Sequence, residues 1–372
     1  MKNKILVTGG CGFIGSFLVD LLIEKGYFVR IFDNLDPQVH GTGKSPIWLN
    51  AHAEFIQGDV RNYDAFDKAL NGIDAVFHNA AAVGVGQSQY QIKHYSDVNI
   101  GGTANLLDLI VNKHEQIKKI IVAGSMSCYG EGSYECSKCG PVRAELRSDN
   151  ALKKNDWEVH CPHCKQNLKP IGTSENKPFE CNSIYAITKK AQEEMVLNIG
   201  QTYKIPAVAL RYFNVYGPRQ SLSNPYTGVA AIFLSRLKNN NSPVIYEDGL
   251  QTRDFISVHD VVKANLMVLE NEKANYQSFN VGTGKAISVL EIAETLSKLL
   301  NKNIKPEITK KFRAGDIRHC VSDISKITET VGFKPDSDFE RGLKELIEWS
   351  VFQKADDKFE IVTKELESKG LL

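Results

Sequence analysis

The sequence predicts an α/β fold in which helices cover both faces of a parallel β-sheet. One observation is the alternation of short apolar runs with segments of helical periodicity over the first 130 residues. Another is a glycine-rich turn between the first apolar run and the first helical segment. A third is the length of 372 residues, 42% of them hydrophobic, which is enough for a large core and two or three domains. Repeated strand–helix–strand units of this kind form doubly wound parallel sheets.

Each predicted element follows from a local pattern. In the first helix, apolar residues recur at helical spacing from Phe13 to Leu22, and Gly26 follows as a stop. The expected strands cover residues 4–7, 28–32, 54–57, 75–78, 119–123 and 207–210. The expected helices cover residues 13–24, 99–112 and 183–200, with a C-terminal helix near 341–352.

One segment interrupts the alternation. Residues 131–172 contain charges, glycines, prolines and paired cysteines, with little apolar periodicity. The alternation resumes afterwards, so this segment is predicted to be an insertion. The expected domains are a sheet domain of residues 1–130 and 173–216, the insertion of residues 131–172, and a smaller C-terminal domain. That last domain covers mainly residues 217–372, from which some segments return to the sheet domain.

The charge balance argues against nucleic-acid or membrane-surface binding, since Lys and Arg number 45 and Asp and Glu 44. No apolar run approaches the ~20 residues of a membrane span. The N-terminus is charged like that of a signal peptide, but its apolar run is only a few residues long and ends at Gly9. The expected location is therefore the cytoplasm, with no nucleic-acid or membrane partner.

The glycine-rich turn predicts a dinucleotide site of the Rossmann type. Glycines at 9, 12 and 15 permit a tight turn, close approach of the backbone to a pyrophosphate, and close packing of helix on strand. Asp33 ends the second strand, where its carboxylate can accept hydrogen bonds from the ribose hydroxyls of NAD and repel the 2′-phosphate of NADP. Asp59 follows the third strand and can reach the adenine amino group; the alternative is that it is only a turn residue.

Three further residues predict acid–base chemistry. Tyr185 and Lys189 stand at i and i+4, so both side chains leave one face of the same helix. A nearby ammonium lowers the pKa of a phenol, which favours proton transfer by Tyr185. Ser125 follows the fifth strand and can hold the same substrate hydroxyl. Such a Tyr–Lys pair is common on helix surfaces, so its weight comes from the dinucleotide motif and Ser125.

Together these motifs resemble those of the extended short-chain dehydrogenases/reductases, especially the nucleotide-sugar 4-epimerases. The resemblance covers nearly the whole chain outside the insertion. It is carried by residues 8–15, 79–81, 99, 125–130, 185–189, 211–218, 253–255 and 313–316. It implies an NAD-dependent enzyme whose sheet domain is a Rossmann-type NAD-binding domain and whose C-terminal domain binds the substrate.

The resemblance also implies a role for individual residues. It makes Ser125, Tyr185 and Lys189 catalytic. Contacts to NAD are expected from Gly9, Gly12, Phe13, Ile14, Gly15, Asp33, Asn34, Asp59, Val60, Ala80, Ala81, Asn99 and Lys189. Contacts to the substrate are expected from Ser125, Asn214, Arg253, Arg313 and Cys320. The two guanidinium groups suit the substrate diphosphate, the alternative for each being a surface ion pair. The small side chain of Cys320 is a hint of a roomy sugar pocket.

The reaction is predicted from what is missing. Related 4,6-dehydratases carry an Asp-Glu pair at the positions of Met126 and Ser127, and neither residue here can do that acid–base work. Cys128 lies one residue beyond the cysteine of related epimerase-reductases and is expected to be a core residue. Ser, Tyr and Lys suffice for reversible oxidation at C4, so the expected reaction is 4-epimerisation through a transient 4-keto sugar. The alternatives are net oxidation or reduction of the sugar, and a non-catalytic NAD sensor.

Substrate and assembly are predicted from finer similarities. The chain is similar to bacterial 4-epimerases of dTDP-L-rhamnose in Arg219-Gln220, in residues 223–226, in Arg318-His319-Cys320 and in a cysteine-bearing insertion. This favours a dTDP-hexose, with a UDP-hexose as the alternative. Family members commonly form homodimers through two helices, for which the apolar stretches 106–111 and 191–199 are candidates; the alternative is that both are core.

The insertion predicts a metal site. Cys136, Cys139, Cys161 and Cys164 form two C-x-x-C pairs, and a loop of 21 residues between them gives the spacing of a zinc ribbon. Structural zinc is the expected metal, and would supply much of the folding free energy of a segment with almost no core. Iron and a redox dithiol pair are the alternatives, and His163 is expected not to be a ligand.

Overall fold

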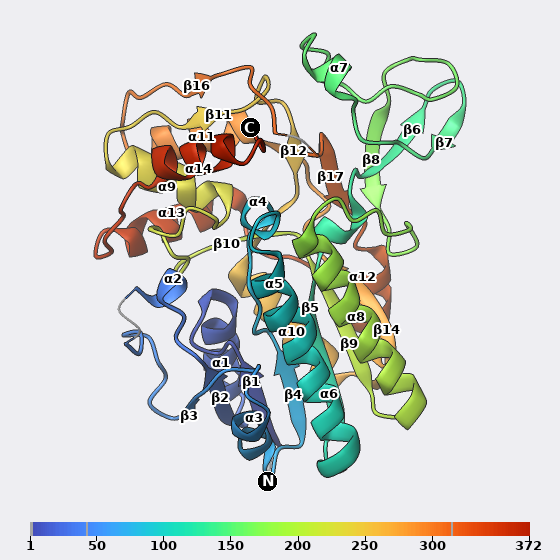
Figure 1. The fold of residues 1–372 in the computed structure, drawn as a ribbon, viewed down its shortest axis with the longest axis vertical. Helices are drawn as coiled ribbons and strands as arrows, with labels where there is room; N and C mark the ends of the chain where they lie inside the picture. The colour runs from blue at the N-terminus through green and yellow to red at the C-terminus, as the bar shows by residue number, and fades with distance from the viewer. Residues whose placement is uncertain (1–2, 42–43, 314) are drawn as a thin grey trace.

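The structure, a computed structural model, describes residues 3–41, 44–313 and 315–372 (Figure 1). Residues 1–2 and 42–43 of the predicted sheet domain, and Ala314 of the motif at 313–316, lie outside the described residues. A seven-stranded sheet confirms the predicted α/β class, and every neighbouring pair of its strands is parallel. Its strands are, in spatial order, β14 (Gln277–Val281), β9 (Ala207–Tyr212), β5 (Lys119–Ser125), β4 (Ala75–His78), β1 (Lys4–Thr8), β2 (Phe28–Asp33) and β3 (Glu54–Gln57).

Helices pack on both faces of this sheet. One face is covered by α1 (Phe13–Glu24), α10 (Val258–Glu270) and α12 (Ser325–Val331). The other is covered by α3 (Tyr63–Leu70), α6 (Gly102–Lys113) and α8 (Ile184–Tyr203). Side chains of a strand point alternately to the two faces, so Ile5 and Val7 belong to the first core and Leu6 to the second. Burial on both faces explains why these strands read as continuous apolar runs.

The predicted elements are present with small shifts at their ends. The helix at 13–24 is α1, and the C-terminal helix near 341–352 is α13 (Phe339–Ser350). The helix at 99–112 is α6, preceded by a π-helical turn (Ser96–Gly101). The short helices α2 (Pro37–His40), α4 (Val85–Ser88) and α5 (Ile92–Tyr95), and the 3₁₀ turns Met126–Tyr129 and Glu272–Ala274, connect these elements.

The C-terminal region forms a smaller unit above the carboxyl ends of the sheet strands (Figure 1). Apolar faces of α9 (Val229–Lys238), α11 (Val289–Leu299) and α13 pack into its separate core. Two short parallel pairs complete it: β10 (Asn214–Tyr216) with β13 (Phe255–Ser257), and β11 (Val244–Ile245) with β16 (Glu307–Ile308). A last helix that the sequence patterns did not predict, α14 (Phe359–Ser368), lies beside α9.

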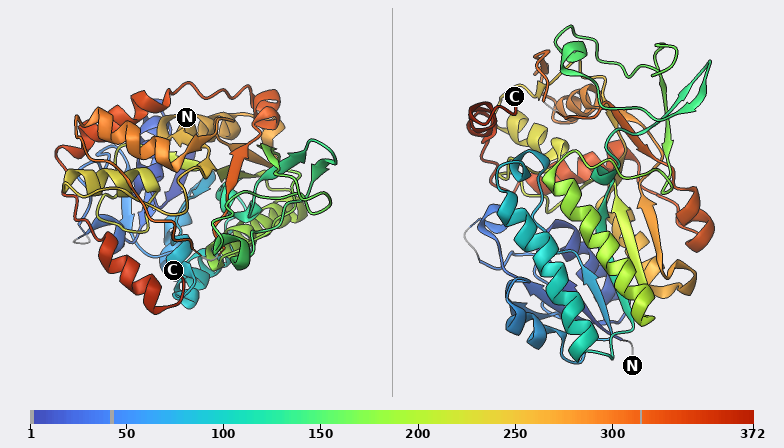
Figure 2. Two further views of the ribbon diagram at one scale, coloured as in Figure 1. Left: turned by 90° about the horizontal axis from the view of Figure 1, so that it is seen from above. Right: turned by 45° about the vertical axis from the view of Figure 1, so that its right-hand side comes forward.

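The cysteine-bearing insertion is joined to the C-terminal region through a shared sheet. Its strands are β6 (Ser133–Cys136), β7 (Gly140–Val142) and β8 (Lys169–Thr173), and it contains the short helix α7 (Asp149–Leu152). The six strands of this sheet follow the order β15 (Ile287–Ser288), β12 (Thr252–Arg253), β17 (His319–Ser322), β8, β6 and β7. In both views of Figure 2 the insertion projects from the side of the molecule where β17 lies. Its position therefore depends on segments more than 100 residues away in the chain.

Within the described residues, no helix combines the length and the apolar character needed to cross a bilayer.

Candidate active site

A cavity of about 770 Å³ opens at the carboxyl ends of the sheet strands, between the sheet domain and the C-terminal region. Parallel α/β sheets bind their ligands at this end of the strands. Most of the predicted site residues line the cavity: Gly9, Gly12, Phe13, Ile14, Gly15, Asp33, Asn34, Asp59, Val60, Ala80, Ala81, Ser125, Tyr185, Lys189, Asn214, Arg253 and Arg313. Among the residues predicted to contact NAD or substrate, Asn99 and Cys320 do not line it.

The glycine turn forms one end of the cavity, where backbone lies against backbone. Gly9 has a φ of +68°, and a Cβ atom there would lie 3.0 Å from the backbone nitrogen of Ala80. A Cβ on Gly15 would lie only 2.1 Å from the carbonyl oxygen of Gly9. On Gly12, by contrast, a Cβ would meet only that same oxygen, at 3.3 Å, and would otherwise point into open space. The side of the turn that a pyrophosphate approaches is therefore clear of protein atoms.

The start of α1 suits an anion. Its N-cap is Gly12, which provides no side-chain cap, and the first turn contains no acidic residue. The first N–H groups of a helix have no partner within it, and the helix dipole adds positive potential at this end. The residues present thus fit the pyrophosphate of a dinucleotide.

Asp33 and Asp59 lie where a nucleoside would extend from this turn. Asp33 is buried, and its two carboxylate oxygens accept from the backbone N–H groups of Cys11 at 3.0 Å and Leu35 at 2.9 Å. The fixed negative charge favours ribose hydroxyls and disfavours a phosphate. Asn34 donates to Asp59 at 3.0 Å. Hydrogen bonds from Arg61 lower the pKa of Asp59 to about 2, so it too is anionic at neutral pH.

Asn99 supports the cavity wall from behind. Its side chain exchanges hydrogen bonds with the backbone of Ala82, at 2.8 and 3.1 Å, and donates to Thr188 of α8 at 2.9 Å. It thereby fixes the turn that contains Ala80 and Ala81 against the helix that carries the predicted catalytic pair. Asn99 is fully buried, so its side chain supports the cofactor end of the cavity indirectly, through its contact with this turn.

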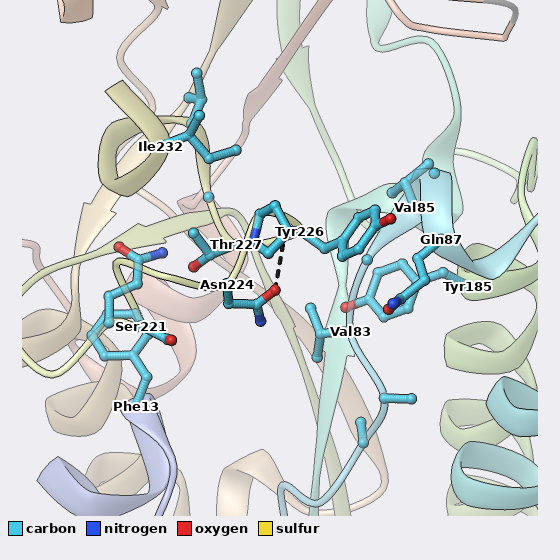
Figure 3. Close-up of a pocket in the computed structure, with 18 of the residues that line it drawn as sticks. Phe13, Val83, Val85, Gln87, Tyr185, Ser221, Asn224, Tyr226, Thr227 and Ile232 are labelled. Carbon is cyan, nitrogen blue, oxygen red and sulfur yellow. Dashed lines mark hydrogen bonds between the residues drawn. The ribbon is translucent and has the colours of Figure 1, made fainter. Parts of the chain in front are cut away.

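The predicted catalytic residues meet at the centre of the cavity. Ser183 caps α8 by accepting from the N–H of Ala186 at 3.1 Å, and the backbone N–H of Tyr185 donates to Ser88 at 3.0 Å. These bonds fix the first turn of the helix, from which Tyr185 points into the cavity beside Val83 (Figure 3). The side chain of Ser125 lies close enough to the Tyr185 hydroxyl to lower its pKa. A hydroxyl of a ligand can therefore meet both.

The expected effect of Lys189 on Tyr185 differs from what the structure shows. Lys189 donates to the backbone carbonyl of Ala123 at 3.0 Å. Burial raises the pKa of Tyr185 to about 12, and the nearby side chain of Ser125 opposes this rise only in part. The spacing of Tyr185 and Lys189 along the helix does not report desolvation, which disfavours a buried phenolate. Burial also lowers the pKa of Lys189, to about 8, so it remains a cation at neutral pH.

Two arginines stand at the other end of the cavity and share one carboxylate. Arg253 donates to Asp316 at 3.2 Å, and Arg313 donates to the other oxygen of Asp316 at 2.8 Å. These cations lower the pKa of Asp316 to about 2 although burial opposes it. The side-chain oxygen of Asn214 is buried and has no hydrogen-bond partner among the described residues. Positive charge and an unsatisfied polar group at this end fit an anionic, hydrogen-bonding ligand.

Cys320 and Cys128 are both core residues. Cys320 packs with Met126 and Ile317, with its sulfur 3.9 Å from the hydroxyl of Thr173, so it lies behind the cavity wall. Cys128 is fully buried, as predicted. Of the stretches considered for a dimer contact, residues 106–111 contribute Leu106, Leu107, Leu109 and Ile110 to the core of the subunit itself.

Sequence patterns did not find the part of the cavity wall that surrounds Tyr226. Tyr226 donates to Glu365 of α14 at 3.0 Å, and its hydroxyl also contacts that of Tyr90. Val83, Gln87 and Asn224 lie nearby (Figure 3). These residues come from short loops and from a helix beyond the predicted C-terminal one, and no periodic pattern marks them.

The four paired cysteines come together in the insertion. The sulfur atoms of Cys136, Cys139, Cys161 and Cys164 all lie within 4.8 Å of one another. Tetrahedral zinc with Zn–S bonds of about 2.3 Å places its sulfurs roughly 3.8 Å apart. This spacing lies between the 3.4 Å that separates the sulfurs of Cys136 and Cys164 and the 4.8 Å upper limit of the cluster. Tyr134, Val159 and Leu168 pack beside the two buried cysteines and give the insertion a small core. The donor set and the spacing fit a metal ion.

Comparison with known proteins supports the resemblance to nucleotide-sugar epimerases. Residues 5–155 match the model of the NAD dependent epimerase/dehydratase family, and residues 167–346 match that of GDP-mannose 4,6 dehydratase. The chain is 35% identical over 359 residues to a dTDP-L-rhamnose 4-epimerase of Burkholderia thailandensis, covering 96% of this chain and 97% of that protein. The chain belongs to the nucleotide-sugar epimerases of the extended short-chain dehydrogenase/reductase family. The resemblance stated from the motifs alone is thus confirmed.

Two solved structures show the same fold in this family. The UDP-glucose 4-epimerase of Thermotoga maritima, solved with UDP-glucose, has a TM-score of 0.77 and 31% identity over 93% of this chain and 98% of its own. The UDP-glucose 4-epimerase of Thermus thermophilus, solved with NAD, has a TM-score of 0.74 and 27% identity over 94% of this chain and all of its own. The NAD-dependent enzyme class predicted for this epimerase family member is therefore confirmed.

Proposed function

We propose that this enzyme interconverts the C4 epimers of a nucleotide-activated hexose through a transient 4-keto sugar. The observation that carries the proposal is that Ser125 and Tyr185 line the same cavity as the glycine turn and the arginine pair. The glycine turn and Asp33 fit NAD at one end. The arginine pair with Asn214 fits the diphosphate of the substrate at the other, which brings the sugar to Tyr185.

Each catalytic residue has a distinct task. Bound NAD supplies a hydride acceptor and donor for C4. Tyr185 accepts the proton of the C4 hydroxyl during oxidation and returns it during reduction. The high pKa that burial gives Tyr185 makes its phenolate a strong base. We expect the cationic Lys189 one helical turn away to stabilise the phenolate that forms during turnover. Ser125 holds the same substrate oxygen. If the keto sugar turns over before reduction, the configuration at C4 inverts without net redox change.

The residues after Ser125 support epimerisation over dehydration. Ser127 hydroxyl lies 2.9 Å from that of Ser125, so this position does face the catalytic group. Ser127 carries a hydroxyl in place of a carboxyl. A serine hydroxyl cannot do the work of a carboxyl as general acid or base at neutral pH. Met126 likewise has no proton to exchange. The match of residues 167–346 to a dehydratase model lies outside this segment.

The favoured substrate is a dTDP-hexose, and dTDP-L-rhamnose in particular. Support comes from the similarity to the Burkholderia enzyme of that name and from the motifs at Arg219-Gln220 and Arg318-His319. A UDP-hexose is the main competitor, because the Thermotoga enzyme was solved with UDP-glucose. The diphosphate is common to both, so the arginine pair does not distinguish them.

We also propose that the four cysteines of the insertion hold a structural zinc ion. Four thiolates are the donor set of closed structural zinc sites, and their sulfurs are already close together. Metal analysis of the purified protein, with Cys139→Ser as the comparison, tests this directly. One bound zinc per chain that falls to zero in the variant supports it, whereas bound iron or no metal refutes it. The homodimer expected from the family stays a prediction, which light scattering would test.

The reaction is tested by incubating the purified enzyme with dTDP- and UDP-hexoses, without added reductant, and following the configuration at C4 by NMR. Conversion of one sugar to its C4 epimer with no accumulation of NADH supports the proposal and identifies the substrate. Accumulation of NADH reassigns the enzyme to net oxidation. Absence of conversion despite bound NAD reassigns it to a sensing role.

A further inference from the structure

One buried arginine of the insertion forms hydrogen bonds with residues of the C-terminal region. Arg147 belongs to the segment 131–172, and its side chain is 3% exposed. Its Nη1 and Nη2 donate to the two carboxylate oxygens of Glu247, at 2.8 and 2.9 Å. Nη2 also donates to the backbone carbonyl of Asp316 at 3.0 Å. Nη1 donates to the carbonyl of Trp157 at 3.1 Å, which keeps the guanidinium attached to the insertion.

Both outside partners of Arg147 are adjacent to the arginine pair of the cavity. Asp316, held through its backbone, is the carboxylate that Arg253 and Arg313 share. The backbone N–H of Glu247 donates to the backbone carbonyl of Lys311 at 2.7 Å, and Lys311 lies two residues before Arg313. It also follows Tyr246, whose ring lies 5.3 Å from the guanidinium carbon of Arg313. Arg147 therefore contacts the two segments that fix Arg313 from both sides.

A second buried arginine ties the same region to the insertion. Arg318 donates to Glu158 of the insertion and to Glu247 at 3.1 Å. Its backbone carbonyl accepts from Arg253 at 3.0 Å. The backbone N–H of Arg318 donates to both oxygens of Glu131, at 3.0 and 2.9 Å. The arginine pair thus rests on a charged network, part of which lies in the insertion.

The chemistry of Arg147 favours positioning over general stabilisation. A surface ion pair adds little stability, and a buried pair can be replaced by apolar residues without loss. A planar guanidinium that binds one carboxylate with two parallel hydrogen bonds does fix the relative orientation of its partners. Here those partners are Glu247, which follows the cavity-wall residue Tyr246, and the backbone of Asp316, whose carboxylate pairs with both cavity arginines.

We propose that Arg147 is a positioning residue through which the insertion sets the arginine pair that binds the substrate diphosphate. This inference rests on the proposed function for the identity of the ligand. It gives the insertion a purpose, because the insertion completes the substrate site from behind while contributing no group of its own to the reacting sugar. Loss of Arg147 weakens nucleotide binding and leaves the transfer of hydride and proton at Tyr185 intact.

The test compares Arg147→Met with Arg143→Met. Arg143 belongs to the same insertion, but its side chain is 75% exposed and pairs with Glu180. Titration calorimetry of the NAD-loaded enzyme with dTDP, and separately with UDP, gives the dissociation constant. We expect Arg147→Met to raise this constant and the KM of the sugar nucleotide about tenfold, with kcat within about threefold of wild type. Arg147→Lys is expected to lie between, because one ammonium cannot reproduce the two parallel bonds. Arg143→Met is expected to match wild type.

Several results would overturn the proposal: normal nucleoside diphosphate binding by Arg147→Met, a fall in kcat at constant KM, or an equal loss in Arg143→Met. If Arg147→Met does not fold, Arg147→Lys and Glu247→Gln replace it, and normal binding by both overturns the proposal. Wild-type enzyme that binds neither diphosphate overturns it as well. Binding without epimerisation refutes only the proposed function, since the effect of Arg147 on the dissociation constant is then still measurable.

Discussion

The two ends of the cavity differ in the kind of contact that shapes them. The glycine turn at the cofactor end consists of backbone at van der Waals contact, where Gly9 and Gly15 leave no room for a side chain. The substrate end consists of charged side chains, Arg253, Arg313 and Asp316, which come from different segments and are joined by hydrogen bonds. One end is shaped by steric exclusion and the other by electrostatic pairing.

This difference teaches how each end can be changed. Steric contacts within one turn are short in sequence and insensitive to distant substitutions, but even one added methyl group disrupts them. An ionic network tolerates small changes of shape, yet it depends on every segment that supplies a charge. Substitutions within the glycine turn should therefore disrupt the cofactor end, whereas the substrate end should also respond to changes in the insertion.

The largest expected effect is at the residue where the two ends meet. Tyr185→Phe removes the hydroxyl that exchanges the C4 proton, so kcat should fall by about a thousandfold. NAD binding should be unchanged, because the ring remains. NMR of sugar conversion gives kcat, and titration of the variant with NAD checks binding. Tyr95→Phe is the matched control, since Tyr95 is a neighbouring buried tyrosine that donates to Gln87 at 3.0 Å, and its kcat should fall less than tenfold. Near-normal turnover in Tyr185→Phe would remove Tyr185 from the mechanism.

The next effect tests the steric end. Gly15→Ala places a Cβ 2.1 Å from the carbonyl oxygen of Gly9, so the turn must open. We expect a loss of stability of about 2 kcal/mol or more and at least tenfold weaker NAD binding, measured by thermal melting and calorimetry. In Gly101→Ala the nearest atom to the new Cβ is 3.9 Å away, so this variant should behave like wild type. Unimpaired NAD binding by Gly15→Ala would show that close packing does not define this end.

The same division explains how far the sequence could be interpreted. The glycine turn and the first strand and helix follow from neighbouring residues, and their predicted positions agree with the structure. The pair of Arg147 and Glu247 spans 100 residues, and neither has a pattern around it that identifies the partner. Long-range pairing of charges depends on the fold and leaves no local periodicity.

The roles of single residues were predictable only where geometry is local. Tyr185 and Lys189 were placed on one helix face from their spacing, but the direction of the tyrosine pKa depended on burial, which spacing does not report. Cys320 was expected beside the sugar and lies behind the wall. The helix α14 was missed because it follows the last predicted helix after a short irregular segment, and its contact through Glu365 is tertiary.

The third prediction tests the dependence of the substrate end on the insertion. Removal of metal by a chelator, or Cys139→Ser, should loosen the cluster that orders residues 136–164 and lower the melting temperature by several degrees. The KM for the sugar nucleotide should rise severalfold through the contacts of Arg147, while the affinity for NAD stays constant. Re-addition of zinc should restore the chelated enzyme but not the variant. Equal weakening of NAD and sugar-nucleotide binding would show that the metal supports the whole subunit and not one end.

The last prediction concerns the charge between the two ends, whose effect appears only above neutral pH. Burial lowers the pKa of Lys189 to about 8 in the folded protein, against 10.5 for an ordinary lysine. Between these values the unfolded chain holds a proton that the folded chain has released, so folding stability contributed by this group rises with pH across that window. The cost of the buried cation is complete below pH 8 and disappears above 10.5. Relative to Lys189→Met, the nucleotide-free wild type should gain up to about 3 kcal/mol of stability from pH 7.5 to 10.5.

Melting temperatures of both proteins across this range measure that gain, and Lys190→Met is the control. Lys190 is the next residue of α8, more exposed and paired with Glu194, so its substitution controls for the loss of a lysine from the same helix. If the stability difference between wild type and Lys189→Met is the same at every pH, Lys189 is hydrated, and its charge acts only weakly on Tyr185. A rising difference would mean that the fold maintains a destabilising cation at neutral pH. Such a charge is useful only beside a phenolate that forms during turnover, which makes the electrostatics at the meeting point of the two ends part of the catalytic design.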